Sequence, residues 1–170
     1  MPIVESLYLK KKVSPKSLLT EEMRRFLEKK EFIDVGTCSS LSKPNVAPKF
    51  LVKVEDDHIY LADYVFGRTV ANLKKNPRVS LSTINLATLT GYQINGIARI
   101  ISSGLEFKKL MKEMQGRQVK FSASRLIEGL RKETKYKDFE VTLPEKVCIF
   151  KIRINEVAEI GKSGKVQRKK

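Results

Sequence analysis

Gly67, Arg68 and Thr69 stand together where a strand-like apolar run gives way to a helical one. The glycine permits a tight turn, the arginine carries a fork of N–H donors, and the threonine adds a hydroxyl donor. The first backbone N–H groups of a helix have no partner within it, and the helix dipole adds positive charge there. Such a place binds phosphate well. The triplet therefore predicts a phosphate site, although an ordinary helix N-terminus would have the same residues.

Two lysines precede this turn at even spacing on one predicted strand. Because side chains alternate along a strand, Lys49 and Lys53 are expected on one face, with Phe50 and Val52 on the other. A strand with two outward cations and inward apolar groups can form the floor beneath a flat anionic ligand. The alternative is that both lysines keep an edge strand soluble.

The segments around these residues alternate between strand-like and helix-like periodicity. A helix is expected over residues 14–30 with Thr20 as its N-cap, and a short helix over 69–76, ended by Pro77. A helical insert is expected over about 105–135, with a break near Gly116. Short strands at this spacing predict a mainly β fold, an antiparallel barrel decorated by helices. The strands are expected over residues 32–40, 46–54, 58–63, 78–85, 90–103 and 146–160, with Gly96 at a bulge or barrel corner.

The chain has 170 residues, the length of one domain, and a formal net charge of +15. That charge is compatible with nucleic acid, an anionic membrane surface or an anionic ligand. The basic residues are spread along the chain and mixed with glutamates on the predicted helices, and aromatic residues do not alternate with them. Nucleic-acid binding is therefore not expected. Residues 161–170 are polar and basic, and they are expected to form a disordered tail after a domain of residues 1–160.

No apolar run approaches the ~20 residues that a membrane-spanning helix needs, and the first residues lack the pattern of a secretory signal. Cys38 and Cys148 lie in apolar strand-like runs and are expected to be buried free thiols. Free thiols suit a reducing compartment, so the expected location is the cytoplasm. His58, the single histidine, has two aspartates beside it but too few neighbours for a metal site. No metal is expected.

Three runs of the sequence carry a resemblance to a known family. They are GTCSSLSKPNVAP (36–48), HIYLADYVFGRTVANLKKNPRVSLS (58–82) and GYQINGIARI (91–100). In order and spacing they are similar to the first hairpin, the strand with phosphate turn and short helix, and a later strand of the FMN-binding split-barrel superfamily. The matching branch includes pyridoxamine 5′-phosphate oxidase and small FMN-binding proteins.

This resemblance implies a six-stranded antiparallel split barrel, a homodimer, and one FMN in each of two clefts at the dimer interface. Arg68 and Thr69 fall where the family binds the FMN phosphate, with Gly67 at the turn. Backbone amides near Lys49–Leu51 are expected to stabilise negative charge on the reduced ring. The other positions that the resemblance places near the cofactor are Pro48, Lys49, Phe50 and Leu51 on one strand, Lys53 beyond them, Ala62 and Asp63 at the end of the next strand, and Gln93.

The chain departs from the oxidase branch at its C-terminal end. It contains no tryptophan and ends KIRINEVAEIGKSGKVQRKK, where that branch has an Arg/Trp-rich segment that grips pyridoxal phosphate. A true pyridoxamine-phosphate oxidase is therefore not expected. The resemblance implies a flavin-dependent oxidoreductase acting on a small molecule that the sequence does not identify. The alternatives are a non-catalytic FMN carrier or electron-transfer protein, and a relative that binds a deazaflavin or haem.

Overall fold

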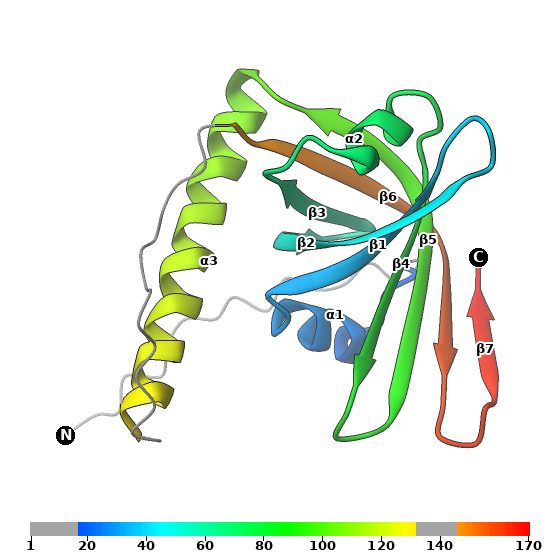
Figure 1. Ribbon diagram of the computed structural model, residues 1–170. Coiled ribbons are helices and arrows are strands. Elements are labelled where there is room, and N and C mark those ends of the chain that lie inside the picture. The colour runs from blue at the N-terminus through cyan, green and yellow to red at the C-terminus, as the bar shows by residue number, and fades with distance from the viewer. Residues whose placement is uncertain (1–16, 132–145) are drawn as a thin grey trace.

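The computed structural model describes residues 17–131 and 146–170, and its main feature is a closed antiparallel barrel (Figure 1). The strands follow the order β3-β2-β1-β4-β5-β6-β7, and a further pairing between β3 and β6 closes a ring of six. The predicted six-stranded barrel is confirmed. The strand bounds are β1 Phe32–Cys38, β2 Pro44–Glu55, β3 His58–Asp63, β4 Arg78–Asn85, β5 Thr90–Ile101, β6 Cys148–Ile160 and β7 Val166–Lys169.

Two short helices close the ends of the barrel (Figure 1). Helix α1 (Glu21–Glu28) adds Met23 and Leu27 to the core inside the barrel, and α2 (Arg68–Leu73) adds Val70 and Leu73 at the other end. Thr20 is the N-cap of α1, as predicted, and its hydroxyl accepts a hydrogen bond from the Met23 amide at 3.2 Å. The helix is shorter than the expected 14–30, and residues 14–16 lie outside the described part of the chain.

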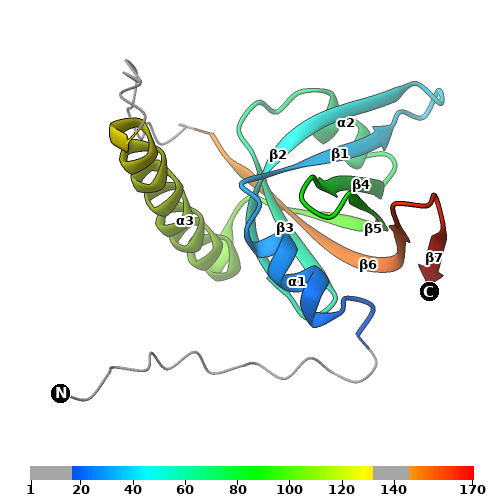
Figure 2. The same ribbon diagram turned by 90° about the horizontal axis from the view of Figure 1, so that it is seen from below.

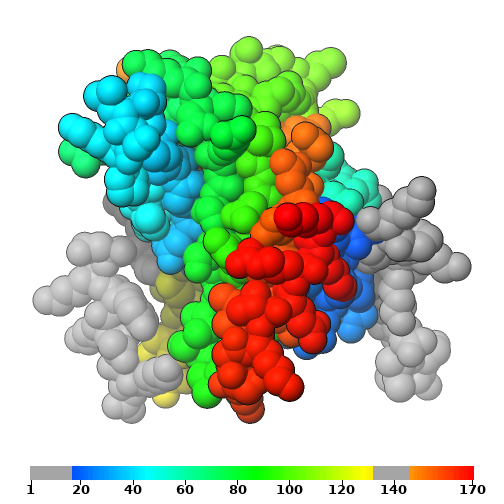
Figure 3. Space-filling model, turned by 90° about the vertical axis from the view of Figure 1, so that its right-hand side faces the viewer, coloured from blue at the N-terminus to red at the C-terminus, as the bar shows by residue number. Residues whose placement is uncertain are grey.

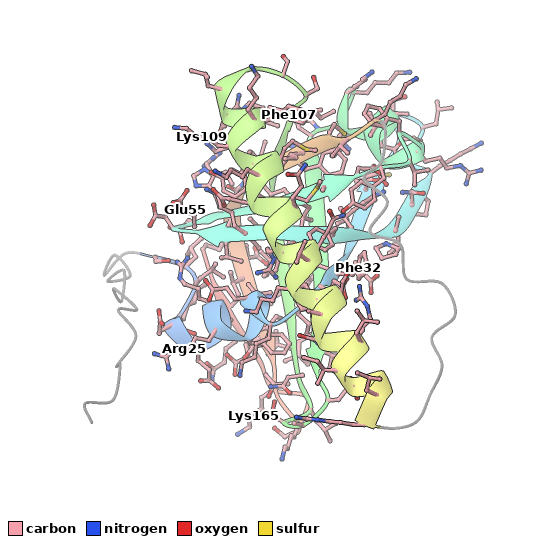
Figure 4. The ribbon with its side chains drawn as sticks, turned by 90° about the vertical axis from the view of Figure 1, so that its left-hand side faces the viewer. Arg25, Phe32, Glu55, Phe107, Lys109 and Lys165 are labelled. Carbon is pink, nitrogen blue, oxygen red and sulfur yellow. The ribbon has the colours of Figure 1, made fainter. Side chains whose placement is uncertain are left out.

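The third helix, α3 (Gly104–Arg131), lies along the outside of the barrel (Figures 2 and 4). Leu110 and Met114 pack on residues of β2, β3 and β6 and form a second apolar core with them. Arg117 fixes the helix to the barrel, because its guanidinium donates to the carbonyls of Leu51, Glu28 and Lys30. Burial lowers the pKa of Arg117. The outer face of β2 and β3 is thus covered by helix α3.

Helix α3 runs without interruption through Gly116, so the expected break there is wrong. A Cβ added at Gly116 would meet nothing within 4 Å, and glycine's only penalty at this position is its conformational entropy. One missing side chain does not end a helix whose other side packs on a core. The expected end of the insert, residues 132–135, lies outside the described residues.

The bulge predicted at Gly96 is confirmed. The register between β5 and β6 shifts between Asn95 and Gly96, and Asn155 of β6 is the additional residue. A Cβ on Gly96 would lie 2.4 Å from the Arg153 carbonyl oxygen and 2.9 Å from Ile152 Cγ2. Only glycine permits β6 to approach this closely.

Gly96→Ala should destabilise the protein by at least ~1–3 kcal/mol, because the methyl group collides with backbone that cannot move away. Gly116→Ala is the matched control, and it should stabilise helix α3 by roughly 0.5–1 kcal/mol. Urea unfolding of both variants measures the difference. Equal stability of the two variants would contradict the close approach at Gly96.

The C-terminal residues differ from expectation. The tail was expected to be disordered, but Val166–Lys169 form β7, which pairs with residues 157–160 of β6. Arg168 also forms an ion pair with Glu156 at 2.6 Å. Pairing is possible because β3 occupies this edge of β6 only as far as Arg153, which leaves the rest of the edge open. No helix in the described residues is long and apolar enough to span a membrane.

Candidate functional site

The predicted phosphate turn lies between β3 and α2. Gly67 is the N-cap residue of α2, and no side chain caps the first N–H groups of this helix, in contrast to Thr20 on α1. Arg68 is exposed at the helix start, whereas Thr69 is buried. The turn therefore presents backbone donors, a guanidinium and a hydroxyl at one place.

A small polar network of side chains from β1, β2 and α2 surrounds the Thr69 hydroxyl. The Asn45 amide on β2 donates to the Thr69 hydroxyl at 3.2 Å and lies 3.4 Å from the hydroxyl oxygen of Thr37 on β1. Asn72 donates to the same Thr37 oxygen at 3.1 Å. Because Thr69 accepts from Asn45, its own O–H proton remains able to point at a ligand.

Sequence reasoning missed Thr37, Asn45 and Asn72. Asn45 falls just outside the strand expected over residues 46–54, but it lies within β2. The spacing of Thr69 and Asn72, three residues apart on a helix, could have indicated that they share a face. Their partners on β1 and β2 become visible only in the folded chain.

The two lysines of β2 do not share a face, contrary to expectation. Val52 is an additional residue in the pairing of β2 with β3, and this bulge reverses the alternation between Lys49 and Lys53. Lys53 points toward α3, where it lies 3.2 Å from Glu113 and 5.0 Å from the centre of the Tyr60 ring. Lys53 is therefore separated from the phosphate turn.

Lys49 is buried instead of outward. Its Nζ atom lies 2.9 Å from Oδ2 of Asp63, and the side chains are 7% and 1% exposed. Asp63 Oδ2 accepts no aligned hydrogen bond from the described residues, so the attraction is that of an ion pair. The other oxygen of Asp63, Oδ1, accepts from the Val65 amide at 2.9 Å and shapes the turn toward Arg68.

The remaining residues that the resemblance implied are separated in the single chain. Phe50 and Ala62 are buried beneath α3, and Leu51 lies in the barrel core. The Leu51 amide donates to the Glu31 carbonyl at 2.8 Å, so it is not free to stabilise charge on a ring. Pro48 is exposed on β2.

Gln93 lies on β5, and β1 and β4 separate it from β2 in the sheet. Its amide donates to the Ser80 hydroxyl at 3.4 Å. Ser80 lines a groove of about 720 Å³ on the face that Figure 3 turns to the viewer, between the β1–β2 hairpin, β4, β5 and the C-terminal strand. None of the residues predicted to bind the cofactor lines this groove, but Asn45 and Thr37 do, so the polar network joins the groove to Thr69.

His58 begins β3, at the end of the strand opposite to the phosphate turn. Within the described ranges, no three His, Cys, Asp or Glu side chains lie close enough together to hold a metal ion.

Both cysteines are free, as expected, but only Cys148 is buried, whereas Cys38 is half-buried beside the groove. Burial raises the pKa of Cys148 to about 11, which leaves little thiolate at neutral pH. In a Cys38→Ser variant, we therefore expect no thiol to react with a thiol reagent until denaturant is added. Reaction of Cys148 in the native variant at the rate of the unfolded chain would contradict its burial.

Comparison with known proteins assigns the class of this fold. Residues 19–159 match the family model described as pyridoxamine 5′-phosphate oxidase. The chain belongs to this family, the pyridoxamine 5′-phosphate oxidase-like split barrels. An uncharacterized protein of Methanocaldococcus jannaschii is 35% identical over 99 residues, which are 56% of this chain and 64% of that protein. The chain thus spans less than two thirds of the length of this curated relative.

Solved structures share the fold at lower identity. HupZ of Group A Streptococcus superposes with a TM-score of 0.61 at 20% identity, over 85% of this chain and 95% of that chain. An FMN-binding protein of Nostoc punctiforme related to pyridoxamine 5′-phosphate oxidase gives 0.51 at 12% identity, over 86% and 90%.

Two further neighbours indicate that this fold serves different cofactors. An F420 reductase has a TM-score of 0.54 at 14% identity, over 82% of this chain and 98% of that chain. The haem storage protein HutZ of Vibrio cholerae has 0.55 at 16% identity, over 79% and 88%. The structural neighbours thus include FMN, F420 and haem proteins, and the shared fold alone does not select one of these three ligands for the present chain.

Proposed function

We propose that this protein binds FMN through the turn at Gly67–Thr69 and acts as a homodimeric, cytoplasmic flavin-dependent oxidoreductase on a small molecule. The single observation that carries the proposal is the start of α2, where helix N–H groups without a side-chain cap stand beside the exposed Arg68 and the oriented hydroxyl of Thr69. These donors fit a phosphate monoester.

The position of His58 favours a flavin over a histidine-ligated haem. It is the only histidine of the chain, and the six residues of β3 separate it from the phosphate turn. A strand of that length spans roughly 17–20 Å. The polar donors at the turn suit an anion better than an iron.

The place of Gln93 is compatible with the proposed dimer. Within one chain, β1 and β4 separate Gln93 from β2 in the sheet, and in a homodimer Gln93 of the partner subunit would instead approach the cofactor held at this chain's turn. The groove beside Ser80 lies on the face opposite α3 and offers a surface on which a second copy can seat. The active unit would then have two equivalent sites.

In this proposal, bound flavin would supply the two-electron chemistry. Arg68 neutralises phosphate charge, and Thr69 donates its hydroxyl proton to a phosphate oxygen. Asn45 keeps that hydroxyl oriented by donating to its oxygen. The Lys49–Asp63 pair holds the turn in place through the Val65 amide.

The absorption spectrum of the protein purified from cells tests the proposal first, because flavin, deazaflavin and haem have different visible spectra. Titration of the apo-protein with FMN, F420 and haemin should then show the tightest binding for FMN, and light scattering should give twice the mass of one chain. Reduction by NADH or NADPH with a panel of acceptors separates an enzyme from a carrier. Tight binding of haemin or F420 with no binding of FMN would overturn the assignment.

A further inference from the structure

Helix α3 makes polar contacts with the segment that leads into the phosphate turn. Tyr64 is the first residue after β3, and its hydroxyl accepts from the Gln118 amide at 3.0 Å. The same hydroxyl lies 3.8 Å from the sulfur of Met114, one helical turn earlier on α3. Figure 4 shows α3 lying in front of the sheet that carries this segment. The insert thus contacts the site from the outside of the barrel.

The turn needs such support, because its backbone is strained and its other side chains are exposed. Phe66 has a φ of +52°, a conformation that is costly for a bulky side chain. Val65 and Phe66 are 77% and 44% exposed, so packing contributes little to holding them. The next residue is Gly67, the N-cap of α2. The conformation of this turn therefore decides where Arg68 lies.

The burial of one polar atom of Gln118 costs the protein stability. Its Oε1 atom is buried and has no hydrogen-bond partner among the described residues. An unpaired buried acceptor lowers stability, and a methionine of similar volume would remove that penalty. The favourable contact that this amide makes is with Tyr64.

The contact does not change over the physiological pH range. Burial raises the pKa of Tyr64 to about 12, so its hydroxyl keeps its proton. It can then accept from Gln118 and point its own hydrogen toward the Met114 sulfur at once.

We propose that the helical insert α3 holds the phosphate turn in its binding conformation through the Gln118–Tyr64 contact, which makes both residues positioning residues for the phosphate. This inference rests on the proposed function, since it concerns the same phosphate site. It gives the insert a role other than covering the sheet. Loss of the contact should leave the fold intact while Arg68 and the α2 amides become less ordered.

Gln118→Met tests the inference. Its free energy of unfolding should equal or exceed that of the wild type, because the orphaned acceptor is gone. Amide hydrogens of residues 64–69 should exchange faster, and the affinity for FMN should fall by about threefold to tenfold, the worth of one hydrogen bond. The affinity for riboflavin, which has no phosphate, should not change. Gln115→Met, on the same helix, is the matched control and should behave as the wild type does.

The two measurements separate the inference from the function on which it rests. Hydrogen exchange needs no ligand, so unchanged exchange at residues 64–69 in Gln118→Met overturns the positioning role whatever the protein binds. An unchanged ratio of FMN to riboflavin affinity also overturns it. If the wild type binds FMN no better than riboflavin, the phosphate site itself is wrong. Tyr64→Phe provides a second variant that keeps the ring packed on α3 and should show the same faster exchange.

Discussion

Arg68→Ala is expected to remove most of the affinity for FMN while the protein stays folded. The Arg68 side chain is exposed, so its loss should cost little stability. A charge-assisted hydrogen bond contributes about 1.5–3 kcal/mol, which corresponds to a loss of roughly tenfold to 100-fold in affinity. A titration of the apo-protein with FMN, monitored by flavin fluorescence, measures this loss of affinity.

Two controls make this result specific to the phosphate. Riboflavin should bind Arg68→Ala as well as it binds the wild type, because only the phosphate has lost its partner. Lys75→Ala removes an exposed cation just beyond the C-terminal end of α2. Its affinity for FMN should stay within about twofold of the wild-type value, as expected for a screened exposed charge. A variant that retains full FMN affinity would remove Arg68 from the site.

The largest loss of stability is expected from Lys49→Met. The substitution leaves the Asp63 carboxylate buried with no countercharge, and breaking a buried pair in this way costs about 3–5 kcal/mol. Because Asp63 also accepts from the Val65 amide, the turn that leads to Arg68 should loosen as well. Urea denaturation, monitored by circular dichroism, gives the free energy of unfolding.

The double variant Lys49→Met/Asp63→Asn should recover part of that loss. It removes the unpaired charge and keeps an amide oxygen that can accept from Val65. Lys53→Met is the matched control on the same strand, because its ion pairs are partly exposed and should contribute no more than ~1 kcal/mol. Equal effects of the two lysine substitutions would show that Lys49 is not a buried ion-pair partner.

The bulge at Val52 determines where the two lysines of β2 lie. Strict alternation of side chains would place Lys49 and Lys53 on one face of β2, as a cationic floor beneath a ligand. The additional residue Val52 breaks that alternation. One additional residue sends Lys53 to the helix side, while Lys49 joins Asp63 inside the end of the barrel. The cationic contribution to the proposed site then comes from Arg68, with Lys49 acting only through Asp63.

Local sequence patterns were sufficient to predict much of the fold. The predicted bounds of β3 and β4 agree with the structure, and so do the cap at Thr20 and the bulge at Gly96. Each depends on residues close in sequence, such as an alternating apolar run, a capping hydroxyl or a missing Cβ. The Gly67–Arg68–Thr69 turn belongs with them, since a glycine and a helix start are local features. Its role in binding phosphate stays a prediction.

The sequence by itself determined most of the strands, the cap at Thr20 and the turn at Gly67 that precedes a helix, because short-range geometry governs those features. Only the tertiary structure decided which lysine is buried, which asparagine orients Thr69, and where the groove opens. It also turned the tail into β7 and set Gln118 against Tyr64. These features depend on strand register and on residues brought together from distant parts of the chain. A local sequence pattern does not indicate which distant residue a side chain will contact.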